Sequence, residues 1–426
     1  MRVLVVSNRY PPGDVGAYEN ECQAIAEGLA GRGHEVRVLT APPPRAMPER
    51  DSSMGPPVSR ALSMAGGPDQ APRASTLIER VTEARAHFVS ASNVYGLGEH
   101  VEAFAPDVAY LWNLDGLGGL GFLECLQFLG VPWVWHLLDA VPLQLCSLGG
   151  HVVPGLAASY GNRYDGEYLL GAEHLLAEIE DAGLRLAGER TVVPPWVHDG
   201  PAPPTFERPS GDGLRILYSG ELTEAGRVPA LIEAAARLRA WGHEGFQLEL
   251  RGPIADGSTQ ASINLLGLRD VVTLGSALSR AELSSAYRRS DASVFTLGER
   301  DRFGDAPLQA AILGCVPVIS TECSAAEWLI GGVDCLKYGG TGESLARRIG
   351  ELLDGAVSLA GVAARAQAVA LREYRVDAAL DRVESALERA AQRRAPGLGT
   401  AKEAHHMALL AESVMVKAMS EEGTDG

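Results

Sequence analysis

The sequence has few cysteines, and their spacing excludes the usual zinc sites. None of them forms a Cys-x-x-Cys pair, and no histidine cluster lies beside them to complete a set of zinc ligands. Free and mostly buried thiols are typical of a reducing compartment, so we expect a cytoplasmic protein. The six cysteines are Cys22, Cys125, Cys146, Cys315, Cys323 and Cys335.

Basic residues are also scarce relative to acidic ones. The chain has 37 lysines and arginines against 54 aspartates and glutamates, which gives a formal net charge of -17. A surface of this sign repels phosphate polymers and anionic lipid headgroups. We therefore predict that neither nucleic acid nor a charge-driven membrane surface is a partner.

Long apolar runs are missing as well. A membrane-spanning helix needs about 20 consecutive apolar residues, and the nearest stretch, residues 117–138, is interrupted by Glu124. The apolar run at residues 3–6 is too short for a signal peptide. These absences predict that the chain has no integral membrane segment.

The apolar sequence that is present suffices for two hydrophobic cores. The chain has 426 residues, 46% of them hydrophobic and 21% charged, and this length suits two domains of roughly 180 residues each. A proline-rich stretch predicts the boundary between them. We expect domains at 1–193 and 213–370, a linker at 194–212, a helix at 371–394 that packs back toward the first domain, and a tail at 395–426 that is partly helical or disordered.

Both halves of the chain show alternating strand and helix patterns. A short apolar run, a turn-rich loop, a helical repeat and a second apolar run open the first half, which is typical of a doubly wound sheet. Two such domains predict an α/β fold with parallel sheets and a ligand-binding cleft at the carboxyl ends of the strands. In the first half we expect strands at 3–6, 36–39, near Val58, at 108–112 and at 131–135, and helices with loops at 139–189; in the second, strands at 214–218, 246–250, 271–274, 292–296 and 316–320.

Several short motifs resemble those of one enzyme family. They are residues 7–12 (SNRYPP), 32–36 (RGHEV), 216–220 (ILYSG), 303–304 (FG) and 314–321 (GCVPVIST). In order and spacing this series resembles the retaining glycosyltransferases of family four. The resemblance implies the GT-B fold, in which two Rossmann-like doubly wound domains face each other across a cleft.

The same resemblance implies an activity. Such an enzyme moves a sugar from a nucleotide-diphosphate sugar to an acceptor, here expected to be a small molecule, with retention at the anomeric carbon. The departing diphosphate accepts the acceptor proton, so no dedicated general base, cofactor or metal is expected. High alanine, glycine and arginine usage hints at a GC-rich bacterial genome, where the assembly of specialised metabolites such as antibiotics is common.

The donor residues are carried over position by position. Gly13 and Gly16 precede a helix, where backbone amides can approach phosphate oxygens, although a plain tight turn is the alternative. Amides from Phe303 to Leu308 would face the donor, while Asp305 is equally explained as a helix N-cap. The full donor set is Gly13, Gly16, Gly220, Arg227, Arg251, Leu274, Phe303, Gly304, Asp305, Ala306, Leu308, Gln309 and Glu327.

The donor motif also departs from the family pattern. Asp301 and Gln309 replace the usual pair of glutamates, and Gln309 offers a ribose only a neutral amide. Glu221 and Gly226 occupy the positions of the Arg and Lys that usually hold the diphosphate. We therefore expect Arg227 or Arg251 to supply the missing charge. The alternative is a pseudoenzyme that binds a sugar nucleotide or a partner enzyme without turnover.

The acceptor side is predicted from two strand ends in the first half. Asp139 matches an acid of the family's His-Asp pair, and His136 lies two positions before the expected histidine. We predict Asp301, Asp139 and His136 as catalytic residues, although a histidine at a strand end is often simply packed. The predicted acceptor contacts are Trp112, Asn113 and Asp115.

Two other enzyme classes are disfavoured. A nucleotide-dependent oxidoreductase would have Gly-x-Gly-x-x-Gly after the first strand, which residues 13–16 do not supply. The segment 299–301 (ERD) could serve as the acid-x-acid metal site of the other glycosyltransferase fold. That fold has one main domain, so the two sheet patterns argue against it.

Overall fold

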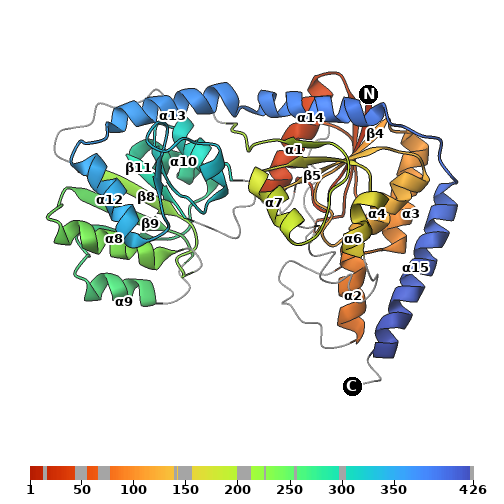
Figure 1. Cartoon of the computed structure of the whole chain (residues 1–426), viewed down its shortest axis with the longest axis horizontal. Helices are drawn as coiled ribbons and strands as arrows, with labels where there is room; N and C mark the ends of the chain where they lie inside the picture. Colours follow the sequence, from red (N-terminus) through yellow and green to blue (C-terminus); the bar gives the residue numbers. More distant parts are fainter. Residues whose placement is uncertain are drawn as a thin grey trace. The chain divides into compact units, whose positions relative to one another are not determined.

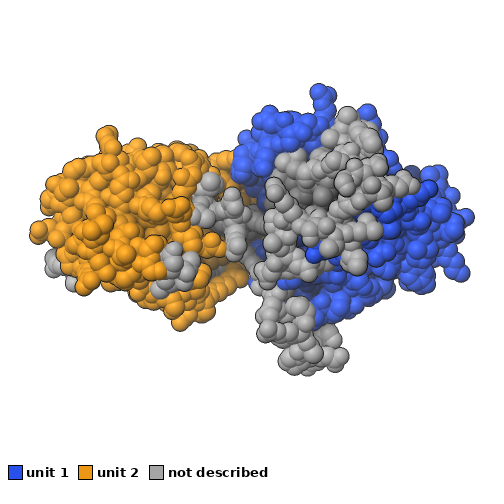
Figure 2. Space-filling model, turned by 90° about the horizontal axis from the view of Figure 1, so that it is seen from below, with its two compact units in different colours: residues 1–193, 379–426 blue, residues 194–378 orange. Residues whose placement is uncertain are grey.

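The chain forms two compact units, which are described separately. Unit 1 comprises residues 1–193 and 379–426, and unit 2 comprises residues 194–378 (Figure 2). The structure is a computed structural model, and it describes residues 1–12, 17–43, 55–65, 77–138, 142, 156–198, 213–224, 227–253, 257–296 and 304–422.

Unit 1 is built on a seven-stranded sheet in which every pairing is parallel. Its strand order is β3-β2-β1-β4-β5-β6-β7. Strands β4 and β5 are buried along their whole length, as expected for parallel strands covered on both faces. The strands are β1 Arg2–Val6, β2 Glu35–Leu39, β3 Val58–Ser59, β4 Val108–Leu111, β5 Trp133–Leu137, β6 Glu167–Leu170 and β7 Arg190–Val192.

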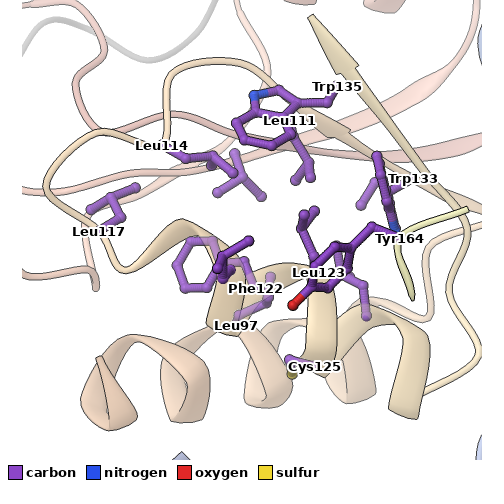
Figure 3. Packing of buried hydrophobic residues seen from close by; sticks show 14 of the residues in the cluster. Leu97, Leu111, Leu114, Leu117, Phe122, Leu123, Cys125, Trp133, Trp135 and Tyr164 are labelled. Carbon is purple, nitrogen blue, oxygen red and sulfur yellow. The ribbon is translucent and has the colours of Figure 1, made fainter. Parts of the chain in front are cut away.

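Helices cover this sheet and supply half of its core. Leu97 of α3 and Phe122 of α4 pack with Leu111 and Trp135 of the sheet (Figure 3). Among the described residues, no helix combines the length and the apolar composition needed to cross a bilayer. The helices of unit 1 are α1 Ala17–Gly31, α2 Leu77–His87, α3 Ala91–Phe104, α4 Gly119–Phe128, α6 Leu156–Arg163, α7 Glu173–Asp181 and α15 Ala401–Glu422.

Unit 2 has a second parallel sheet, with the order β10-β9-β8-β11-β12-β13. Side chains of the central strand β8 point alternately to the two faces of the sheet. Ile216 packs with α8 and α12 on one face, and Leu217 packs with α11 and α13 on the other. The strands are β8 Leu214–Ser219, β9 Phe246–Arg251, β10 Val272–Gly275, β11 Ala292–Phe295, β12 Val316–Ser320 and β13 Leu336–Tyr338. The helices are α8 Val228–Ala240, α9 Ser258–Leu265, α10 Arg280–Arg289, α11 Ala306–Ile312, η2 Ser324–Glu327, α12 Gly342–Leu353 and α13 Leu359–Glu373.

Helix α14 (Val376–Ala391) carries the chain from unit 2 back to unit 1. Its C-terminal end is held by the carboxylate of Glu167, which is fully buried at the start of β6. This carboxylate accepts hydrogen bonds from Arg389 in the last turn of α14 and, at 3.1 Å, from Arg393 just after the helix. Glu384, nearer the middle of the helix, binds Arg32 and His34 at 2.7 Å each. These contacts attach α14 to unit 1.

The structure contains elements that the sequence patterns did not predict. Strand β6 lies in the region 139–189, where we expected helices and loops, and β13 was not expected at all. Strand β6 begins with Glu167, and this charged residue can occupy a fully buried position because Arg389 and Arg393 neutralise it. The tail, expected to be partly helical or disordered, forms α15 over Ala401–Glu422.

Candidate functional site

The strand order of unit 2 defines where a ligand can bind. Strand β8 has β9 on one side and β11 on the other, so the chain leaves β8 and β11 in opposite directions at their carboxyl ends. Ligands of open parallel sheets bind at this switch point. The described residues there come from the segments after β8 (220–224 and 227) and before α11 (304 and 305).

Two glycines set the path of the chain after β8. The amide of Gly220 donates to the carbonyl oxygen of Arg251 at 2.9 Å, and a Cβ on Gly252 would lie 1.7 Å from the Gly220 carbonyl oxygen. Only glycine permits so close an approach. On the other side, the Tyr218 hydroxyl donates to the carbonyl oxygen of Glu221 at 3.1 Å. The predicted donor residue Gly220 is therefore held rigidly at this edge.

Arg227 is an exposed cation at the same edge. It precedes α8 with a φ of 56°, a left-handed conformation that is unfavourable for any residue with a Cβ. Its guanidinium lies 3.2 Å from the carboxylate of Glu322, which follows β12, and each side chain is 48% exposed. Ion pairs this exposed contribute little to stability, so Arg227 can exchange Glu322 for a bound anion.

Arg251 has a different environment. Its guanidinium pairs with Glu249 at 2.5 Å, and Glu249 also binds Arg289 at 3.4 Å. The guanidinium also lies beside Gly275, where a Cβ would come within 2.2 Å of it. Arg251 thus has a carboxylate partner on its own strand, which it shares with Arg289. Of the two arginines predicted to hold the diphosphate, Arg227 is better placed.

The start of α11 contains five of the predicted donor residues. Gly304 has a φ of 69°, and Asp305 is the N-cap without a side-chain hydrogen bond to the helix amides. Instead, the Asp305 carboxylate accepts a hydrogen bond from the side-chain amide of Gln309, which is buried. In the first turn, the amides of Ala306 and Leu308 have no acceptor within the helix.

Two further predicted donor residues of unit 2 lie on other elements. Leu274 lies on β10, two strands from β8, and is partly buried. Glu327 is exposed at the end of η2. Gly13, Gly16, Asp139, Asp301 and Phe303, which we predicted from the sequence, lie outside the described residues, as does Gly226.

Two residues predicted to contact substrate are core residues instead. Trp112 is fully buried, and its indole N–H donates to the carbonyl oxygen of Tyr18 at 2.8 Å. His136 is also fully buried, with Nδ1 2.7 Å from the Tyr110 hydroxyl and its ring centroid 4.4 Å from that of Trp112. Burial lowers the pKa of His136 to about 3, so its ring is neutral at physiological pH. The arrangement supports packing rather than acceptor contact or catalysis.

Asn113 and Asp115 lie at the switch point of unit 1, between β1 and β4. The amide of Asn8 donates to the Asn113 carbonyl oxygen at 2.7 Å, and the Asn8 side chain donates to the Asp115 carbonyl oxygen at 3.0 Å. The side chain of Asp115 is 45% exposed, whereas Asn113 is only 9% exposed. Asp115 is therefore the accessible member of the predicted acceptor set.

Two residues with a positioning role were not predicted as site residues. Asn8 joins the two loops of this switch point, and its place in the SNRYPP motif is a signal that could have identified it. Arg60, which follows β3, donates to the carbonyl oxygens of Tyr10, Pro11 and Ala41. No sequence signal reveals Arg60, because its role depends on β3 meeting the loop after β1.

Within the described part of the chain, no cluster of three or more His, Cys, Asp or Glu side chains is arranged to hold a metal ion. The five described cysteines that are free thiols are all buried: Cys22, Cys125, Cys315, Cys323 and Cys335.

Comparison with known proteins places this architecture in a known fold. Residues 206–370 match the family described as glycosyl transferases group 1. Among solved structures, the chain is similar to a glycosyltransferase from Rickettsia africae at 11% identity, with a TM-score of 0.65 over 91% of this chain and 98% of that one. It is also similar to HepE of Anabaena in complex with UDP and glucose (16% identity, TM-score 0.61, 91% and 100%). A third similar structure is the sucrose-phosphate synthase of Thermosynechococcus elongatus, at 14% identity, with a TM-score of 0.64 over 91% of this chain and 98% of that one.

These likenesses and the two parallel sheets establish the GT-B fold. The family match over most of unit 2 supports a glycosyltransferase. No curated protein sequence matches the chain significantly.

Proposed function

We propose that the chain transfers a sugar from a nucleotide-diphosphate sugar to a small-molecule acceptor, with retention at the anomeric carbon. One observation carries the proposal: the match to glycosyl transferases group 1 spans the edge at which Gly220, Arg227 and Gly304 lie. The complex of HepE with UDP-glucose supports a sugar nucleotide as the ligand class. The buried thiols and the composition support a cytoplasmic, bacterial enzyme, with specialised metabolism as its setting.

The charge balance at this edge supports binding of a diphosphate. A nucleotide diphosphate brings about two negative charges, which must be paired when they leave water. Arg227 supplies one positive charge when it releases Glu322, and the first-turn amides of α11 supply partial positive charge. Glu221 lies on the same segment and opposes the ligand, so Arg227 is the residue on which binding depends.

The chemistry follows from donor binding. The bond between the anomeric carbon and the diphosphate oxygen breaks, and the acceptor oxygen forms the new bond on the same face of the sugar. The acceptor proton passes to the departing diphosphate, whose charge Arg227 stabilises. Neither a cofactor nor a divalent metal enters this scheme. We assign Asp115 as the acceptor contact of unit 1, because its side chain is accessible.

A thermal-shift series with UDP-, GDP- and dTDP-sugars tests the ligand class. We expect one nucleotide series to raise the melting temperature in the presence of EDTA, since ligand binding to the folded state stabilises it. Binding that disappears in EDTA and returns with manganese would show a metal requirement. A chain whose melting temperature responds to no sugar nucleotide is not a sugar-nucleotide transferase.

The second candidate is a pseudoenzyme that binds a sugar nucleotide or a partner enzyme without turnover. The observation that favours it is the environment of Gln309, whose side-chain amide is already bonded to Asp305. A variant with Gln309→Glu restores the carboxylate of the family pattern. Mass spectrometry of the reaction product separates the two candidates. If the chain is a pseudoenzyme, the parent binds the donor without forming product, and Gln309→Glu increases product formation. If the chain is a transferase, the parent itself forms product.

A further inference from the structure

A pocket in unit 1 lies between α15 and two of the helices on which α15 packs, α3 and α4 (Figure 1). Its volume is about 530 Å³, within the range of pockets that bind small molecules. Among the described residues that line it, none belongs to the donor or acceptor sets. Its wall favours an apolar ligand, because side chains of this kind from all three helices form it: Val94, Leu120, Phe128, Ala404 and Ala408.

The pocket reaches the protein surface through two apolar residues. Leu398 and Met407 both line it, and they are 81% and 46% exposed. The amide of Leu398 donates to the carbonyl oxygen of Phe128 at 2.7 Å, which fixes this part of the rim, whereas a methionine side chain can adapt its shape to a ligand. A ligand with an apolar body would remove both side chains from water, which stabilises the complex.

The polar residues that line the pocket form one cluster around the carboxylate of Glu124. Its Oε1 atom accepts hydrogen bonds from Nε of Arg163 at 2.6 Å and from the Tyr164 hydroxyl at 2.8 Å, and Nη2 of Arg163 lies 2.6 Å from the same atom. Among the described residues, none donates a hydrogen bond to the second oxygen, Oε2. The cluster therefore offers a ligand one carboxylate oxygen whose charge Arg163 already balances.

We propose that this pocket binds a neutral amphiphile, a single apolar chain that ends in a hydroxyl group. The chain lies against the wall formed by α4 and α15, and the hydroxyl donates a hydrogen bond to Oε2 of Glu124. The cluster selects this head group by charge. A carboxylate would meet the Glu124 oxygen and an ammonium would meet the Arg163 guanidinium, and either charge would leave water without an unshared partner of opposite sign. This inference does not depend on the proposed sugar transfer.

Calorimetric titration of the full chain with 1-octanol, octanoate and octylamine tests the head group. The three probes share one apolar chain, so their order of affinity reports the polar cluster alone. We expect 1-octanol to bind at least about tenfold more tightly than either charged probe. In the series from butanol through hexanol to octanol, each pair of added methylenes should tighten binding about tenfold, because each enters the apolar pocket. Absence of octanol binding, or octanoate or octylamine binding that is as tight, overturns the proposal.

Substitutions locate the binding in this pocket. Ala411 lines it and is exposed, so Ala411→Trp can fill the pocket from the surface and should weaken octanol binding at least about tenfold. The matched control is Ser413→Trp, because Ser413 is exposed on α15 outside the pocket lining. Glu124→Ala removes the carboxylate that pairs with Arg163, so octanoate should then bind more tightly than octanol. Equal effects of the two tryptophans, or an unchanged order of probes in Glu124→Ala, would contradict the assignment.

Discussion

At the scale of single residues, Arg227 combines a strained backbone with an accessible charge. Its φ of 56° disfavours every side chain with a Cβ by roughly 1 kcal/mol. Its ion pair with Glu322 is half exposed and contributes little to folding. The residue is therefore kept at this position at some cost in stability, which fits a role in binding rather than in folding.

Replacement of Arg227 separates these two roles. Arg227→Gly removes the charge and relieves the backbone strain, so we expect an unchanged or higher melting temperature together with donor binding at least about tenfold weaker, a loss of ~1.4 kcal/mol. Calorimetric titration with the sugar nucleotide gives the affinity. Arg251→Ala is the comparison, and it should have the smaller effect because Arg251 is paired with Glu249. Two variants that bind the donor like the parent would rule out Arg227 and Arg251 as the clamp.

The buried His136 gives a prediction about pH. Its folded pKa is about 3, whereas an exposed histidine in the unfolded chain has a pKa of about 6.5. Between these values the unfolded chain binds a proton that the folded chain excludes, so the free energy of unfolding falls as the pH decreases from 6.5. The slope from this one residue is at most about 1.4 kcal/mol per pH unit. Urea unfolding at pH 7.5 and 5.5 measures it.

His136→Gln is the control for this pH dependence. The substitution removes the titrating ring, so the variant should lose less stability than the parent between the two pH values, whatever its stability at pH 7.5. Equal losses in parent and variant would mean that His136 is protonated in the folded state, contrary to its full burial.

At the scale of elements, the attachment of α14 depends on an ion pair that only the folded chain assembles. Arg389→Met together with Arg393→Met leaves the Glu167 carboxylate buried without a cation, which we expect to destabilise unit 1 by about 3 kcal/mol. Glu167→Gln removes the buried charge as well and should be milder. Urea unfolding checks the order of the two variants.

The exposed Arg382, also on α14, provides the matched control for these arginine substitutions. Arg382→Met removes the same charge from the helix surface and should leave the unfolding midpoint nearly unchanged. If it destabilises the protein as much as the double variant does, the loss comes from the helix surface rather than from Glu167.

The same elements show how far sequence patterns reach. Strands with uninterrupted apolar runs, such as β1, β4 and β12, were predicted because burial on both faces leaves a local signal. Strand β6 left only a weak signal, because just three apolar residues follow Glu167, whose cations lie more than 200 positions later in the chain. Sequence patterns report the local preference of a segment, whereas β6 is stabilised by arginines that are distant in the sequence.

The residues of the site were harder to predict from the sequence than the elements of the fold. Gly220, Arg227 and Gly304 lie at the edge expected for them, since strand ends of a parallel sheet share one edge. Trp112 and His136 also lie at strand ends, but their side chains point into the core, which spacing alone cannot distinguish. Arg60 acts on a loop 49 and 50 residues away in the sequence, so no motif includes it.

At the scale of the whole molecule, the two units differ in how the chain completes them. Unit 2 is one continuous segment with buried apolar clusters on both faces of its sheet. We expect an isolated chain of residues 194–378 to fold with a cooperative thermal transition and dispersed amide resonances. A chain of residues 1–378 should lose the cooperative transition of unit 1, because it lacks α15 and the arginines that pair with Glu167. If unit 1 melts normally in that chain, the C-terminal segment is dispensable.

The discontinuity of unit 1 also sets an order of events during synthesis. Domains that are continuous in sequence fold as they leave the ribosome, usually starting with the first one made. Here the first unit to emerge stays incomplete while residues 194–378 are translated, because its sheet must wait for α14 and α15. Unit 2 is therefore free to reach its native state first. Until then Glu167 stays hydrated, and the surface of unit 1 that α15 will cover is the part of the nascent chain most in need of chaperone protection.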